Sequence, residues 1–108
     1  MQWAAHMDSR DIDGVIESWL VRVRGHVQGV GCRDACMRRA RAQSVTGWVR
    51  NRLDGSVEVM LQGSREQLVD MCSWLRDGIS AALVDELDVT QVQPPLPRFD
   101  HFDRLPTL

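Results

Sequence analysis

The part of the sequence best suited to chemistry is the glycine-rich stretch Gly25-His26-Val27-Gln28-Gly29-Val30-Gly31, which Arg33 closely follows. Glycines permit backbone angles at which successive N–H groups converge into an anion-binding nest. A helix that begins just after the stretch would turn its free N–H groups and the positive end of its dipole toward the same place. Arg33 would add a planar, two-pronged donor that suits phosphate or carboxylate. These residues therefore indicate an anion site, with a flexible glycine connection beside a surface arginine as the alternative.

All thirteen cationic residues of the 108-residue chain are arginines. The absence of lysine excludes Schiff-base and pyridoxal-phosphate catalysis, and it excludes the lysine-containing phosphate loop of Walker-type nucleotide hydrolases. Eight arginines lie from Arg22 to Arg52 with one acidic residue, Asp34, so this basic segment carries +7 while the whole chain carries -2. Such a charge indicates a small phosphorylated ligand, a nucleic-acid backbone, or only solvated strand and helix faces.

The three cysteines, Cys32, Cys36 and Cys72, form no CxxC pair and have no zinc-ligand spacing. Cys32 and Cys36 are four residues apart, so on a helix they face the same way, and we interpret them as buried thiols without a chemical role. An odd number of cysteines argues against a disulfide-bonded secreted domain and favours the reducing cytoplasm. The acidic first residues predict no signal peptide, and no apolar run has the length of a membrane span.

Hydrophobic periodicity predicts the element order β-α-β-β-α-β, with alternating apolar residues in the strands and apolar residues three or four apart in the helices. Asp54-Gly55 is a hairpin signal between the second and third strands, and the spacing of Ser64 and Gln67 is that of a helix capping box. The expected strands are 18–24, 45–51, 57–62 and 83–92, and the expected helices are 32–43 and the segment between Ser64 and Gly78.

This order favours an α+β fold of the ferredoxin-like type, an α/β sandwich in which an antiparallel sheet carries both helices on one face. We assign residues 18–108 to this domain and residues 1–17 to a flexible N-terminal extension, because the regular pattern begins at Ser18. The fold hosts many unrelated functions and leaves the activity open.

Two blocks of the sequence resemble the signatures of the acylphosphatases. The stretch from Gly25 to Arg33 resembles the pattern G-x-V-Q-G-V-x-F/Y-R, and Gly47-Trp48-Val49-Arg50-Asn51 looks like the pattern G-W-V-x-N. The order and separation of the blocks also fit, and the similarity covers residues 18–92. The resemblance implies a metal-independent hydrolase without a cofactor, which cleaves the carboxyl-phosphate bond of small acyl phosphates such as acetyl phosphate or 1,3-bisphosphoglycerate.

The resemblance also implies roles for individual residues. Arg33 takes the place of the family's phosphate-binding arginine, and Asn51 takes the place of the asparagine that positions the attacking water. Gln28 is in addition a candidate for a hydrogen bond that braces the loop. We expect a cytoplasmic monomer with no nucleic-acid or membrane partner. The backbone cradle for the phosphate falls on Val27, Gln28, Gly29, Val30, Gly31 and Cys32.

The sequence departs from the family pattern at four positions. Cys32 stands where the family has Phe or Tyr, and Asp34 places a negative charge where the substrate phosphate approaches. Ser44 replaces the glycine that follows the first helix, where a left-handed residue is expected. Arg104 stands where the family has an aliphatic residue, which disfavours a fifth strand at the sheet edge.

Two alternatives to an active acylphosphatase follow from the residues. Cys32 and Asp34 are compatible with a catalytically weak or regulatory domain of the same family. The basic segment is compatible with an RNA- or DNA-binding module on the same sandwich. RNA-binding modules of this topology stack bases on strand aromatics, however, and the central strands offer only Trp48 for this purpose.

Overall fold

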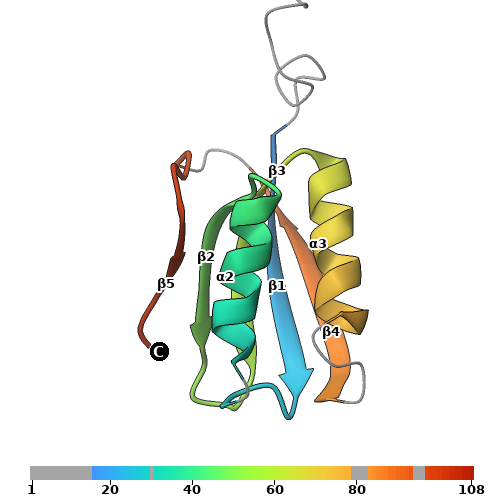
Figure 1. Ribbon diagram of the computed structural model, residues 1–108, viewed down its shortest axis with the longest axis vertical. Coiled ribbons are helices and arrows are strands. Elements are labelled where there is room, and N and C mark those ends of the chain that lie inside the picture. Colours follow the sequence, from blue (N-terminus) through green and yellow to red (C-terminus); the bar gives the residue numbers. More distant parts are fainter. Residues whose placement is uncertain (1–15, 30, 79–82, 94–96) are drawn as a thin grey trace, which may run out of the picture.

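The computed structural model describes residues 16–29, 31–78, 83–93 and 97–108. Its elements follow one another in the predicted order, and both helices cover the same face of the sheet (Figure 1). The strands are β1 (Glu17–Gly25), β2 (Thr46–Asn51), β3 (Val57–Gly63), β4 (Val84–Val92) and β5 (Phe102–Arg104), and the helices are α2 (Cys32–Ala42) and α3 (Arg65–Asp77).

The strands form one sheet in the order β4-β1-β3-β2-β5. The four predicted strands pair antiparallel, β1 with β3 and β4, and β2 with β3. The predicted ferredoxin-like sandwich is confirmed, and the sheet is extended at one edge by β5, which runs parallel to β2. The sheet as a whole is therefore mixed.

The presence of β5 corrects the expectation that Arg104 disfavours a fifth strand. Phe102 anchors the strand because its side chain is only 2% exposed. The Gly47 N–H donates to the His101 carbonyl at 2.9 Å, and the Arg41 guanidinium of α2 donates to the Phe102 carbonyl at 2.9 and 3.1 Å. The Arg104 side chain is 48% exposed at the end of the strand, so this position does not need an aliphatic residue.

Alternate residues of the central strands point toward the helices and form the core, as their period of two predicts. Val21, Val59 and Val49 lie opposite one another across β1, β3 and β2, and all three are fully buried. The three cysteines are free and buried, as predicted. The buried helix residues that belong to this core are Cys32, Cys36 and Ala40 of α2 and Leu68, Met71, Cys72 and Leu75 of α3.

The ends of the helices follow the sequence signals. The Ser64 hydroxyl accepts the Gln67 N–H at 3.2 Å, and the Gln67 side-chain oxygen accepts the Ser64 N–H at 2.9 Å, which is the predicted capping box. Ser44 has a φ of 58°, the left-handed conformation expected after the first helix, and it is the one non-glycine residue with positive φ among the described residues.

Glu17 is the first residue of β1, one residue before the start of the domain that the sequence predicts. Its carboxylate is buried and accepts hydrogen bonds from Trp19, Arg65 and Gln91 at 3.1, 3.0 and 3.1 Å. The rest of the predicted extension, residues 1–15, lies outside the described residues. Within the described ranges, no helix is long and apolar enough to cross a membrane.

Candidate active site

A cavity of about 230 Å³ lies beside the glycine-rich stretch and the first turn of α2, at the end of the sheet to which this stretch leads. It brings together the two sequence blocks, since β2 ends there at Asn51. Of the predicted site residues, Gln28 does not line it, and Val30 lies outside the described residues. The lining residues are Val27, Gly29, Gly31, Cys32, Arg33, Asp34, Asn51 and Arg104.

Two glycines beside the cavity have backbone angles that an anion cradle can use. Gly29 and Gly31 have φ angles of 77° and 78°, which glycine adopts readily. A Cβ atom at either position would meet nothing within 4 Å, so the backbone borders open space. Gly31 is the N-cap of α2 and makes no side-chain capping bond. The first N–H groups of the helix therefore remain available to an anion in the cavity.

Three residues fix the glycine-rich stretch to the rest of the domain. The His26 N–H donates to the Leu83 carbonyl at 2.9 Å, and the Val27 side chain is buried in the core. The Gln28 amide donates to the carbonyls of Arg52 and Ser56 at 2.7 and 2.8 Å. The predicted brace is thus present, and it joins the cradle to the β2–β3 hairpin one residue beyond the end of β2.

Two arginines reach the cavity from different elements. Arg33 lies in the first turn of α2, is partly buried and pairs with no carboxylate of the described part of the chain. Arg104 comes from β5, and its guanidinium donates to the Asp34 carboxylate at 2.8 Å. The negative charge of Asp34, which was expected near the substrate phosphate, is therefore neutralised by an arginine 70 residues away. From the sequence, Arg104 was expected only as an unfavourable strand residue, and no sequence signal indicated that it lines this cavity.

The side chain of Asn51, the last residue of β2, places a buried hydrogen-bond acceptor beside the cavity. Its Oδ1 atom is buried and has no hydrogen-bond partner among the described residues. Its main-chain carbonyl accepts the Leu108 N–H at 3.1 Å, so the backbone at this point is held by the chain that follows β5. Leaving a buried acceptor unpaired costs about 1–3 kcal/mol, so this oxygen can accept a hydrogen bond from a group in the cavity, such as a water molecule.

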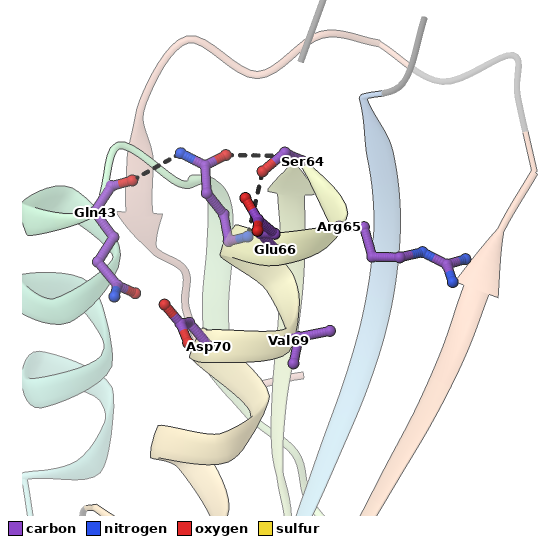
Figure 2. A pocket seen from close by; sticks show the side chains of 7 residues that line it. Gln43, Ser64, Arg65, Glu66, Val69 and Asp70 are labelled. Atoms are coloured by element: carbon purple, nitrogen blue, oxygen red, sulfur yellow. Dashed lines mark hydrogen bonds between the residues drawn. The ribbon is translucent and has the colours of Figure 1, made fainter. Parts of the chain in front are cut away.

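A larger cavity, of about 650 Å³, lies between the C-terminal end of α2 and the first turns of α3 (Figure 2). Glu66 and Asp70 line it with two carboxylates, and Figure 2 shows Arg65 pointing away from Asp70 and Gln43. Because carboxylates repel an anion, the smaller cavity with its two guanidiniums is the better candidate for the predicted anion site.

Comparison with known proteins identifies the family. A model of the acylphosphatase family matches residues 19–103. An acylphosphatase of Polaromonas naphthalenivorans is 67% identical over 98 residues, which are 91% of this chain and 97% of that protein. The chain belongs to the acylphosphatase family. Acylphosphatase 1 of Ralstonia nicotianae is 64% identical over 89 residues, 82% of this chain and 87% of the relative. The structure of an acylphosphatase from Coxiella burnetii has a TM-score of 0.77 at 27% identity and covers 86% of this chain and 96% of that one.

These findings confirm the acylphosphatase that the two sequence blocks predicted. Cys32 is the position in the first block at which this chain departs from the family pattern. It lines the cavity and is also part of the core. Burial raises the pKa of the Cys32 thiol to about 11, although Arg33 acts in the opposite direction. A thiol with this pKa is protonated near neutral pH, so it adds no nucleophile to the acylphosphatase site.

Four of the eight arginines in the basic segment of this acylphosphatase, Arg22, Arg24, Arg50 and Arg52, contact carboxylates on the open face of the sheet. Arg22 and Arg50 contact Glu58 of β3 at 3.2 and 2.9 Å. Burial by itself would raise the pKa of Glu58, but hydrogen bonds from Arg50 and Arg22 hold it below its ordinary value. Arg50 also lies 4.7 Å above the ring of Trp48, the aromatic residue considered for base stacking. In the described part of this face, the Trp48 ring is therefore covered by a guanidinium, whereas bases of single-stranded nucleic acids stack on free aromatic rings.

Proposed function

We propose that this acylphosphatase hydrolyses small acyl phosphates to a carboxylate and inorganic phosphate at the cavity where α2 begins, without a metal or cofactor. The proposal is carried by one observation, the convergence of Arg33, the uncapped N–H groups of α2 and the unpartnered Asn51 oxygen on a single cavity. These groups are an anion receptor and a water acceptor, which are the two parts that the reaction needs.

The phosphoryl group binds to the cradle between Gly29 and the first turn of α2. Phosphoryl transfer depends mainly on positioning and on stabilisation of charge on the equatorial oxygens. Backbone N–H groups and the Arg33 guanidinium can both donate to these oxygens, and the Arg33 fork suits two of them at once. Because Arg33 has no carboxylate partner among the described residues, its charge is available to the substrate.

The attacking water binds to Asn51. Its side-chain oxygen accepts one hydrogen from the water, which satisfies the acceptor that otherwise lacks a partner. A neutral amide suits this position better than a carboxylate because it does not repel an anionic substrate. The water oxygen then attacks phosphorus, and the bond from phosphorus to the acyl oxygen breaks with its electron pair on the carboxylate.

The proton of the attacking water goes to an oxygen of the substrate's own phosphate. Asp34 is the one carboxylate among the lining residues, and its oxygen already accepts a hydrogen bond from Arg104. The leaving carboxylate is a weak base, so it needs no general acid. We expect a pH–rate profile without a step for an enzyme base near neutrality, and such a step, if abolished in Asp34→Asn, would contradict this assignment.

The test of the proposal is hydrolysis of benzoyl phosphate in excess EDTA by the wild type, Arg33→Gln and Asn51→Ala. Removal of one group that stabilises the transition state lowers kcat by about 100-fold or more. Arg38→Gln is the matched control, because Arg38 is exposed on the same helix and does not line the cavity. An inactive wild type, or full activity in both site variants, would overturn the proposal.

We also infer that the protein acts in the cytoplasm as a monomer. The inference of compartment rests on the three free thiols, which an oxidising compartment would not favour. Size-exclusion chromatography with light scattering tests the monomer, and a dimer at micromolar concentration would contradict it.

A further inference from the structure

The cavity holds a second guanidinium that binding of one phosphoryl group does not require. Arg104 lines it from β5, whereas Arg33 lines it from α2. The Arg104 Nη1 atom donates to the Asp34 Oδ1 atom at 2.8 Å, and both side chains are 48% exposed. The pair therefore lies at the part of the cavity that faces solvent, while the cradle lies against the buried residues Val27 and Cys32.

The packing of β5 keeps Arg104 at this position. Phe102, two residues before it, is 2% exposed, and the N–H of Leu105, one residue after it, donates to the Val49 carbonyl at 2.8 Å. The backbone is thus held on both sides of Arg104, and the contact with Asp34 orients the side chain. A guanidinium has five N–H donors, so one hydrogen bond to Asp34 leaves donors for a ligand.

We propose that Arg104 is a specificity-determining residue that binds a carboxylate on the acyl part of the substrate, so that the preferred substrates are monophosphates of dicarboxylic acids. This inference rests on the function proposed above. Asp34 already shows that a carboxylate fits against this guanidinium. The cavity of about 230 Å³ has room for more than the five heavy atoms of a phosphate, since one water needs only about 10–15 Å³ of such volume. The acyl part therefore extends from the cradle toward Arg104.

Arg104 has a second effect, which the experiment must separate from binding. By pairing with Asp34 it shields the phosphoryl group from a negative charge. Loss of shielding lowers kcat/KM equally for every acyl phosphate. Loss of the carboxylate contact lowers kcat/KM only for substrates that carry a carboxylate on the acyl part. Removal of both charges, in Asp34→Asn with Arg104→Gln, eliminates the repulsion but does not restore the contact.

The experiment compares kcat/KM for benzoyl phosphate with that for 3- and 4-carboxybenzoyl phosphate, which add one carboxylate to the same acyl group. The wild type, Arg104→Gln, the double variant and Arg38→Gln are measured. We expect the ratio of carboxylated to plain substrate to fall about tenfold in both Arg104 variants, as for one charge-assisted hydrogen-bonded pair at a half-exposed site. Arg38→Gln, which removes the same charge outside the cavity, leaves the ratio unchanged.

Two results would overturn the inference. An unchanged ratio in Arg104→Gln means that Arg104 makes no contact with the acyl part. The second result is an equal loss of kcat/KM on all three substrates in Arg104→Gln, with recovery in the double variant. It means that Arg104 only shields the phosphoryl group from the charge of Asp34. Failure of the proposed function is a separate outcome, because the wild type would then hydrolyse none of the three. The double variant removes both charges of the Asp34–Arg104 pair, so neither is left without its partner. Its melting temperature verifies that it is folded.

Discussion

Gln28→Met removes the brace between the glycine-rich stretch and the β2–β3 hairpin while retaining the length of the side chain. Two hydrogen bonds are lost, to the carbonyls of Arg52 and Ser56 at 2.7 and 2.8 Å. Neither carbonyl is left without a partner, because the Gly55 N–H donates to Arg52 at 3.1 Å and the Arg52 N–H donates to Ser56 at 2.9 Å. We therefore expect a loss of about 1–2 kcal/mol in the free energy of unfolding, the net value of two ordinary hydrogen bonds.

Urea unfolding measures this loss. With a denaturant slope of about 1.5 kcal/mol per molar urea, the midpoint falls by about 1 M. We expect kcat/KM for benzoyl phosphate to fall between about ten- and 100-fold, because the brace sets the cradle relative to Asn51 and a misplacement of about 1 Å can cost 100-fold. Gln93→Met, the same change at an exposed residue, is the control. A loss of stability with unchanged activity would refute the link between the brace and the cradle, and no change in either would refute the brace itself.

Three further predictions concern stability. Ser44→Gly should raise the free energy of unfolding by about 1 kcal/mol, because the φ of 58° is unfavourable for a residue with a Cβ; a lower melting temperature would contradict this. Phe102→Ala should cost about 3–5 kcal/mol in urea unfolding, because the ring is 2% exposed; a cost below about 1 kcal/mol would show that β5 is not anchored by it. The folded pKa of Glu58 lies below its ordinary value of 4.5, so its contribution to stability is present above that pH and is lost as the pH falls through the folded pKa. Acid unfolding should therefore be less steep in Glu58→Gln below pH 4.5, and identical curves would contradict the role of this carboxylate.

Much of the fold could be predicted because its signals are local. The alternation of Val21 and Val23 is enough to orient β1, since neighbouring strand residues face opposite sides of the sheet. The capping box at Ser64 begins α3 through contacts within three residues. The left-handed conformation at Ser44 was likewise expected from its place after a helix. By contrast, β5 was not expected, because its stability depends on Phe102 filling a space that only the folded sheet and α2 create.

Two blocks can be recognised in the sequence alone, and with them the acylphosphatase family, Arg33 and Asn51 as candidates, and the glycines that line the cavity with positive φ angles. How the charges around these residues are paired depends on the tertiary structure. Asp34 and Arg104 are 70 positions apart, and the Gln28 brace spans 24 and 28 positions. Charge pairing of this kind has no periodic signature, because it depends on which strand edges and helix ends the closed fold brings within hydrogen-bond distance.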